Sequence, residues 1–131
     1  MANEVTQSVA MSVSKGGAAI NSGTLSKTSD MDAASVDMSA VTATASTTTA
    51  ALPVPAAISF ACVGGVDIPF KNLSTTVGES IRLGNANADP ITSLISTVAP
   101  GKSVLLVGLT AAPYVESASG SPFYQFWAVE T

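Results

Sequence analysis

The sequence predicts an all-β protein: a single β-sandwich domain of jelly-roll-like form with an N-terminal strand or arm. Three observations predict it. Apolar and polar residues alternate with a period of two in segment after segment, Gly- and Pro-rich turn signals separate these segments, and helical spacing is scarce. Short strands with turn chemistry between them are typical of sandwiches and barrels. The length of 131 residues suits one domain, since domains commonly hold roughly 100–150 residues.

The alternation predicts where the strands lie. The first runs from Val5 to Ser14, and its apolar positions share one face: Val5, Val9, Met11 and Val13. Further strands are expected at residues 36–38, 58–62, 77–83, 103–109 and 123–129, of which 103–109 reads as a buried strand. For segment 91–98 the sequence gives two alternatives, one helical turn or an irregular strand. Its apolar spacing is helical, but its Ser and Thr residues are weak helix formers. Turn signals stand at residues 15–17, 64–65, 84–85, 100–101 and 120–122.

The two parts of the chain differ in composition. Residues 1–51 contain no aromatic residue and no proline, whereas residues 52–131 contain all of them. A segment without aromatic residues can build little core of its own. We therefore expect residues 1–51 to supply strands or an arm to the domain whose aromatic β core is formed by residues 52–131. The strand from Val5 to Ser14 should pair with the second half or with a neighbouring subunit.

Charge is sparse along the whole chain. Charged residues make up 11% of the sequence, against about 25% in ordinary soluble domains. A neutral, hydroxyl-rich surface gives little repulsion between copies, so it suits a homo-oligomer or a subunit of an assembly. The few Lys and Arg residues are scattered and the net charge is −4. Because binding to phosphates needs clustered cations, direct nucleic-acid binding is not expected.

Groups for catalysis or metal binding are few. The chain has no histidine, and Cys62, its single cysteine, lies in an apolar alternation that indicates an inert buried thiol. Asp30, Asp32 and Asp37 lack the glycine-centred loop of a calcium site and are interpreted as a polar turn. Serines have no histidine to activate them, and no spacing suggests a Ser–Lys pair or a carboxylate pair. We predict no cofactor, no metal and no enzymatic activity.

Residues 100–103, Pro-Gly-Lys-Ser, resemble the end of a phosphate-binding P-loop. That motif needs a glycine where this chain has Ser96, and a helix where Val104 and its neighbours read as strand. A type II turn explains the segment better, because proline presets one φ angle and Gly101 can adopt the positive one.

The C-terminal segment holds a cluster of aromatic residues. Alternation sends Phe123, Gln125 and Trp127 to one face and Tyr124 and Phe126 to the other. Aromatic residues on both faces indicate that one set is covered by a second layer or by another chain. The candidate partner interface combines this cluster with the first strand: Val5, Val9, Met11, Val13, Tyr124, Phe126 and Trp127. Core packing and a sugar-stacking surface are the alternatives for the aromatic residues.

The termini and apolar segments indicate no targeting to a membrane. The first residues carry neither the basic nor the apolar region of a signal peptide. The most apolar stretch, residues 50–66, is too short and too interrupted by proline and glycine to span a bilayer. We expect a protein made in a cytoplasm, without a membrane partner.

From about Leu52 onward the sequence resembles a family of small tailed-bacteriophage virion proteins. The resemblance rests on turn and strand motifs: Lys71-Asn72-Leu73, Val77-Gly78-Glu79, Pro90-Ile91, Pro100-Gly101-Lys102, Pro113-Tyr114-Val115 and Ala128-Val129-Glu130. The segments Met1 to Val5 and Val13 to Gly17 fit the same pattern. Members often end in a Leu- and Ile-rich strand, which is aromatic here.

The resemblance implies a β-sandwich structural subunit of a phage particle, namely a capsid decoration or cement protein located in the virion. Its partners would be the major capsid protein or other virion proteins, and it would stabilise the lattice by burying apolar surface at many repeated contacts. The alternatives are a tail, fibre or head-fibre component and a carbohydrate-binding module.

Overall fold

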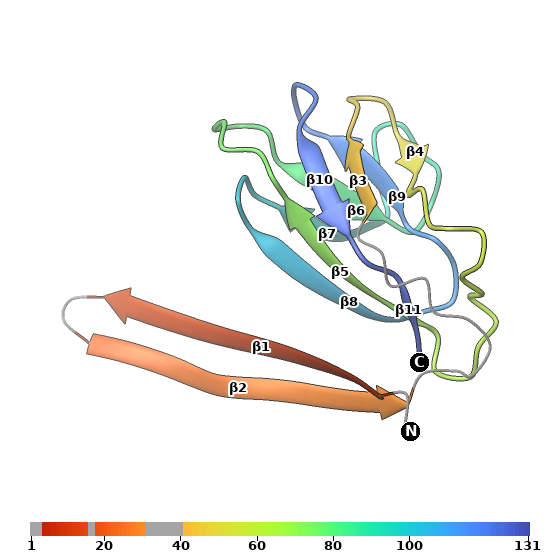
Figure 1. Cartoon of the computed structure of the whole chain (residues 1–131). Coiled ribbons are helices and arrows are strands. Elements are labelled where there is room, and N and C mark those ends of the chain that lie inside the picture. Colours follow the sequence, from red (N-terminus) through yellow and green to blue (C-terminus); the bar gives the residue numbers. More distant parts are fainter. Residues whose placement is uncertain (1–3, 16–17, 31–40) are drawn as a thin grey trace. The chain divides into compact units, whose positions relative to one another are not determined.

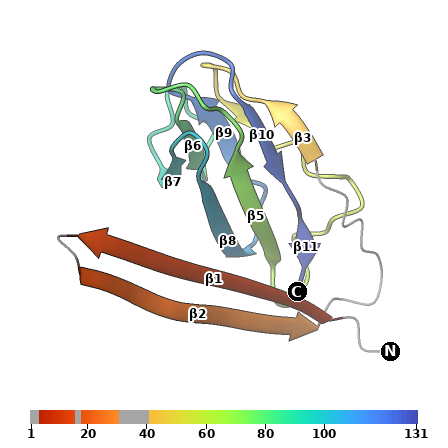
Figure 2. The same ribbon diagram turned by 60° about the vertical axis from the view of Figure 1, so that its left-hand side comes forward.

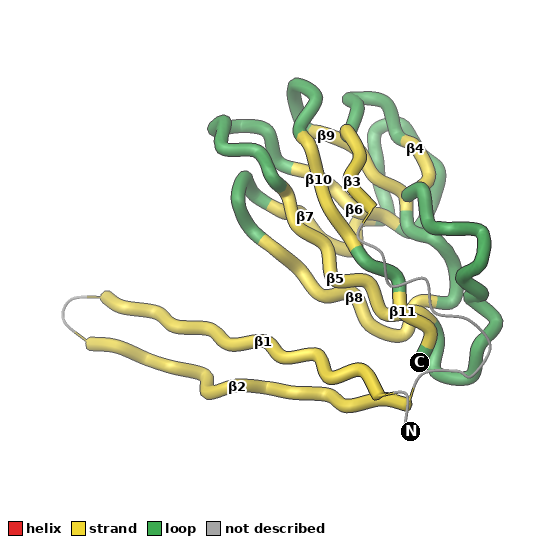
Figure 3. Tube along the Cα trace, viewed as in Figure 1, coloured by secondary structure: helices red, strands yellow, loops and turns green. Residues whose placement is uncertain are grey.

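A computed structural model of the chain describes residues 4–15, 18–30 and 41–131. Every regular element in this part is a β-strand, as Figure 3 shows, which confirms the predicted all-β class. With no helix among the described residues, none is available to cross a membrane. The strands belong to two compact units, a hairpin within residues 1–33 and a sandwich within residues 34–131.

The first unit is a long antiparallel hairpin of β1 (Glu4–Lys15) and β2 (Ala18–Asp30). Strand β1 confirms the first predicted strand, and within the described residues it pairs with β2 and not with a strand of the second half. Pairing with a neighbouring subunit, the other expected partner, stays a prediction. Alternation did not reveal β2 because Ile20 and Leu25 are its two large apolar residues, and a register shift changes their phase. The turn glycines expected after this strand, Gly16 and Gly17, and the strand expected at 36–38 lie outside the described residues.

The second unit is a sandwich of two antiparallel sheets. The first sheet has the order β8-β5-β10-β3 with β11 also paired to β5, and the second has the order β4-β9-β6-β7. The strands are β3 (Val41–Thr44), β4 (Ala50–Ala51), β5 (Val66–Asn72), β6 (Ile81–Gly84), β7 (Leu94–Val98), β8 (Ser103–Leu109), β9 (Tyr114–Ser117), β10 (Phe123–Phe126) and β11 (Val129–Glu130). Strands β3 and β4 precede Leu52, so part of the chain without aromatic residues joins these sheets.

The pairing of strands in the sandwich is nested. Strand β3 pairs with β10, β4 with β9, β5 with β8 and β6 with β7. The chain thus pairs with itself like one long hairpin whose tip is the β6–β7 connection. Successive strand pairs lie in alternate sheets, and the additional pairs β5–β10 and β6–β9 complete each sheet (Figures 1 and 2).

The hydrophobic core lies between the two sheets. Alternate residues of β5, β6 and β10 are turned inward and fully or almost fully buried: Val66, Ile68, Phe70, Ile81, Leu83, Tyr124 and Phe126. The ring of Tyr124 stacks on Phe70 with centroids 5.1 Å apart and lies 6.2 Å from that of Phe126. These three aromatic residues are the largest fully buried side chains of the sandwich, and aromatic side chains bury large apolar areas.

Several predicted strands are confirmed or corrected. Strand β8 has the predicted ends, but Leu106 alone among its residues is buried, so it is a sheet-edge strand and not a buried one. Segment 91–98 contains β7, and the final aromatic strand is interrupted at residues 127–128. The strand expected at 77–83 begins at Ile81, and Val77 is in an exposed loop.

The predicted strand at 58–62 is wrong, and the adjacent β5 was missed. Residues 55–65 form turns, including one closed by the Ile58 N–H, which donates to the Pro55 carbonyl. Strand β5 contains Pro69, and proline ordinarily argues against a central strand. Here Pro69 lies near the interruption between β10 and β11, where its carbonyl accepts from the Trp127 N–H at 3.1 Å.

The Pro100–Gly101 turn is confirmed. The Lys102 N–H donates to the Ala99 carbonyl at 3.0 Å, and Gly101 has a φ of +70°. This is the geometry that a type II turn requires of its third residue. Strand β8 follows the turn directly, where a P-loop needs a helix.

Candidate functional site

Two of the aromatic residues predicted for an interface belong to the core. Tyr124 is 2% exposed and Phe126 is fully buried, so neither offers a surface to a partner or to a sugar. They face inward because β10 is central in its sheet and alternation turns its even-numbered residues toward the second sheet. The opposite face of β10 carries Phe123, which is 59% exposed, and Trp127 just beyond the strand is half-buried. Phe123 is therefore the aromatic residue of this strand that a partner can reach.

The other predicted interface residues lie on β1: Val5, Val9, Met11 and Val13. The structure describes their backbone and register but not their side chains. Val5, Val9 and Val13 are paired across the hairpin with Ser29, Leu25 and Ile20. These residues are thus in a unit different from that of Tyr124, Phe126 and Trp127.

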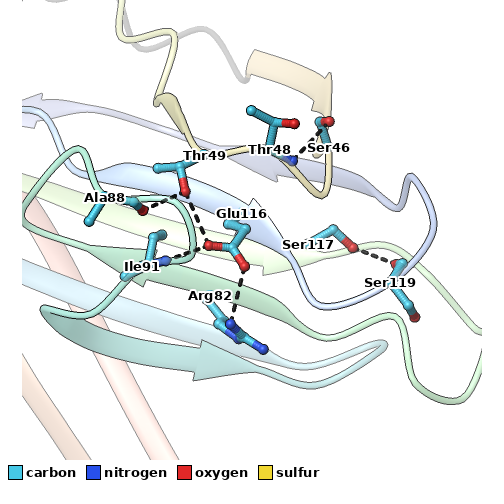
Figure 4. A network of polar contacts seen from close by, with 9 residues as sticks. All are labelled: Ser46, Thr48, Thr49, Arg82, Ala88, Ile91, Glu116, Ser117 and Ser119. Atoms are coloured by element: carbon cyan, nitrogen blue, oxygen red, sulfur yellow. Dashed lines mark hydrogen bonds and ion pairs between the residues drawn. The ribbon is translucent and has the colours of Figure 1, made fainter.

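The most connected polar group of the sandwich is the carboxylate of Glu116 in β9 (Figure 4). One oxygen accepts from the guanidinium of Arg82, directly opposite on β6, at 3.1 Å. The other accepts from the Ile91 N–H at 2.6 Å and from the Thr49 hydroxyl at 3.1 Å. Thr49 also contacts the Ala88 carbonyl at 2.7 Å. Glu116 therefore attaches the β6–β7 connection and the segment before β4 to the outside of the second sheet.

Other carboxylates of the sandwich have the same role. Asp67 in β5 accepts from the Gly108 N–H at 2.7 Å, and buried Glu130 accepts from the Ser59 N–H. Glu79 accepts from the hydroxyl of Ser74. In each case a carboxylate holds a loop or strand end in place. Charge-assisted hydrogen bonds of this kind are stronger than neutral ones, and they stabilise connections that have few apolar residues.

Metal-binding side chains are not brought together in the described part of the chain. Among the described residues, no group of three or more His, Cys, Asp and Glu residues is placed to hold a metal ion. Asp32 and Asp37 lie outside the described part, so the acidic turn predicted there is not described. Cys62 is half-buried and not fully buried as predicted, and its thiol donates to the Gly65 carbonyl.

One hollow of about 310 Å³ lies beside β7 and β8. It is lined by Asn85, Ile95 and residues 108–113. Its volume is at the lower end of the range of ligand pockets, and such pockets usually hold a few convergent polar or charged groups. This lining carries no ionisable side chain, so it supplies no group for acid–base chemistry.

Large apolar residues are exposed at one end of the sandwich. Leu73, Val77 and Phe123 are 38%, 97% and 59% exposed; we call these three residues the loop-end patch. The Leu73 N–H donates to the Phe123 carbonyl at 2.9 Å. The Ser119 hydroxyl donates to the Gly78 carbonyl, which connects the two loops that carry the patch. Both loops lie at the upper end of the sandwich in Figure 1. The alternation did not predict this patch, because it placed Val77 in a strand at residues 77–83.

Comparison of the chain with protein-family models, with curated proteins and with solved structures finds no match. Function must therefore be inferred from the residues and their geometry.

The phenol of Tyr124 predicts a pH-dependent stability. Burial raises its pKa from 10.0 to about 12, because desolvation disfavours the phenolate. The unfolded chain then loses this proton at lower pH than the folded chain, so the stabilisation is complete below pH 10 and is lost as pH rises toward 12. We expect the free energy of unfolding to fall by about 1–3 kcal/mol across this range. Urea unfolding at several pH values measures this fall in the free energy of unfolding. The variant Tyr124→Phe has no phenol to titrate, so the part of the fall that comes from Tyr124 should disappear. An equal fall in the variant would show that Tyr124 is not its source.

Proposed function

We propose that this chain is a non-enzymatic structural subunit of a tailed-bacteriophage particle, a decoration or cement protein that binds the capsid lattice. The observation that carries the proposal is where the sandwich places its charged and its apolar side chains. Its buried carboxylates hold loops in place, while uncharged apolar residues are left at the surface. A surface of this kind suits contact with another protein better than chemistry on a small substrate.

The strand connectivity supports this proposal. We interpret the nested pairing of eight strands, rolled into sheets β3-β10-β5-β8 and β4-β9-β6-β7, as a jelly roll. Jelly rolls are common in viral capsid and lectin domains. The fold is compatible with a sugar-binding role as well, but two aromatic residues considered for stacking are in the core. Exposed apolar residues with few charges favour the virion role.

We assign lattice binding to the loop-end patch. Its members stand on loops connected to each other by hydrogen bonds, so they are held in place before binding. Full burial of a large apolar side chain contributes roughly 1.5–3 kcal/mol. Two or three such residues give a modest single contact, which a shell repeats many times. The major capsid protein is the proposed partner.

The test measures binding of the purified chain to capsids that lack it. The double variant Val77→Asp/Phe123→Asp places two charges in the proposed contact, and we expect binding to weaken by at least ~100-fold. Val107→Asp is the matched control, because Val107 is 50% exposed on β8 and outside the patch. We expect the control to bind like the unchanged chain.

Two results would count against the assignment. Equal binding by the double variant would exclude the loop-end patch as the contact. Binding to isolated tails but not to capsids would favour the tail or fibre alternative over the decoration role.

A further inference from the structure

We propose that the free edge of β8 pairs with the same strand of a second copy of this chain, antiparallel and centred on Leu105. Strand β8 bonds to β5 on one side, and no described strand of either unit pairs with its other side. With seven residues it is longer than β3, β4 and β7, which form other edges of the two sheets. An unpaired edge strand presents a row of N–H and carbonyl groups to which another strand can bond.

The hydrogen bonds at the two ends of β8 determine which of its backbone groups face outward. At the first end, the Lys102 carbonyl accepts from the N–H of Asn72 in β5 at 3.0 Å, so this carbonyl points toward β5. The Ser103 N–H belongs to the same planar peptide unit and points in the opposite direction, away from β5.

At the second end, the Gly108 N–H donates to the carboxylate of Asp67 in β5 at 2.7 Å, and the Val107 carbonyl of that peptide unit therefore points away from β5. Peptide units alternate in direction along a strand. The N–H and carbonyl groups of Ser103, Leu105 and Val107 consequently face outward, where no described strand bonds to them.

Strand β8 carries none of the side chains that protect the edges of sheets. Such edges usually hold a lysine, another charged residue or a proline. Residues 103–109, Ser-Val-Leu-Leu-Val-Gly-Leu, include neither a charge nor a proline. A bulge can also protect an edge, but the register shift of β8 lies beyond Leu106, and the register is regular from Ser103 to Leu106. This part of the edge is therefore open to another strand.

Exposed apolar residues lie beside this edge. Leu94 and Ile95 of β7, the edge strand of the second sheet, are 52% and 39% exposed, and Val107 of β8 is 50% exposed. Ile95 lines the hollow of about 310 Å³ together with Gly108 and Leu109, so β7 and β8 come together there. One side of the sandwich thus offers both backbone groups and apolar surface to a partner.

A second copy of β8 matches these features. In a two-fold antiparallel pair, Leu105 lies opposite its own copy and Ser103 lies opposite Val107, so the outward groups of each copy meet those of the other. Lys102 is the nearest charged residue in the sequence. Antiparallel pairing places its two copies ~20 Å apart, whereas parallel pairing would place them ~5 Å apart. Since like charges directly opposite each other are destabilising, the antiparallel arrangement is favoured.

The size of the edge predicts a weak, reversible dimer. Seven residues at ~3.4 Å each give an edge ~24 Å long, and two sheets ~10 Å apart make it ~20 Å deep with their side chains. About 400–500 Å² per copy would be covered, below the ~800 Å² per partner of a standard stable interface. The dissociation constant should therefore be micromolar or weaker. The loop-end patch lies outside this contact, so failure of this proposal would leave the proposed function standing.

The first test is sedimentation of the full-length chain over a concentration series. We expect reversible dimers whose dissociation constant rises at least ~30-fold in Leu105→Pro, because proline removes the N–H that each copy donates at the two-fold axis. The fold should tolerate this change, since prolines occur in edge strands where the N–H faces outward. Monomers at all concentrations up to ~1 mM would overturn the proposal.

Thr44→Pro is the matched control. Thr44 is exposed on β3, at the opposite edge of the same sheet. Its own N–H faces outward there, because the next residue, Ala45, donates to the Pro122 carbonyl. We expect this variant to dimerise like the unchanged chain. Equal effects of the two proline variants would contradict pairing through β8.

The second test is hydrogen exchange of the backbone amides at high and low concentration. The amides of Ser103, Leu105 and Val107 should exchange slowly in the dimer and rapidly in the dilute monomer, whereas those of Val104 and Leu106 should be protected in both. Equal protection of the three outward amides at every concentration would mean that another part of the same chain covers this edge, and it would overturn the proposal.

The third test locates the two-fold axis. In a Cys62→Ser background, Leu105→Cys should form a disulfide-linked dimer under mild oxidation, because Leu105 faces its own copy. Ser103→Cys should not, because its two copies would be ~14 Å apart, too far for a disulfide. Equal cross-linking at the two positions would contradict antiparallel pairing centred on Leu105.

Discussion

Replacing Phe126 by alanine is expected to lower the free energy of unfolding of the sandwich by about 3–5 kcal/mol. Phe126 is fully buried, and its ring lies 6.2 Å from that of Tyr124, which in turn stacks on Phe70. Truncation removes these contacts and leaves a cavity between two sheets that cannot close around it. Since small domains are stable by only about 5–15 kcal/mol, this single change should leave the fold marginal.

Phe123→Ala is the matched control for this prediction. It is the same substitution on the same strand, but Phe123 is 59% exposed on the opposite face. We expect it to cost less than about 1 kcal/mol. Urea unfolding of both variants, followed by tryptophan fluorescence, gives the comparison. Similar losses of stability in the two variants would mean that β10 does not turn its residues as described. Phe123→Ala should instead weaken binding to capsids while leaving the stability of the sandwich nearly unchanged.

Removing the carboxylate of Glu116 should destabilise the sandwich by about 2–4 kcal/mol in Glu116→Ala. The change leaves the buried Ile91 N–H without its acceptor and the Thr49 hydroxyl with one partner fewer. An unpaired buried donor costs about 1–3 kcal/mol by itself, and hydrogen bonds to a charged acceptor are the stronger ones. Thermal and urea unfolding measure the loss. Amide hydrogen exchange should also show faster exchange in the β6–β7 connection.

Arg82→Ala separates the ion pair from the rest of the network. The Arg82 side chain is 36% exposed, so its pair with Glu116 is partly screened by water and should contribute only about 0.5–1 kcal/mol. The hydrogen bonds of Glu116 to Ile91 and Thr49 remain in this variant. A loss as large as that of Glu116→Ala would show that the ion pair, and not the attachment of the two loops, gives Glu116 its importance.

The features that follow from local sequence were predictable. Strand β8 has its predicted ends because Ser103 follows a Pro-Gly turn whose conformation these two residues dictate. The inward direction of Tyr124 and Phe126 follows from the two-residue period. The sequence could not show, however, that β10 is a central strand, and so it left the core and the interface as equal alternatives for these residues.

Features that depend on distant partners were not predictable. Glu116 has no local signature, because its partners Thr49 and Ile91 are 67 and 25 residues away in the sequence. Strand β5 was not predicted because it contains Pro69. The proline is tolerated there because it lies beside the interruption between β10 and β11. Strand β2 was hidden by a register shift. The exposure of Val77 was also not predicted, because the alternation placed it in a strand, whereas β6 begins only at Ile81.

The central claim, that this chain is a decoration subunit of a phage capsid, is tested most directly by measuring its copy number in purified particles. Quantitative mass spectrometry of virions would give the ratio of this chain to the major capsid protein. The proposed function predicts a fixed, high ratio set by the lattice, and removal of the chain should make the particles less resistant to heating. Absence of the chain from purified virions, or a few copies per particle that remain with detached tails, would contradict the claim.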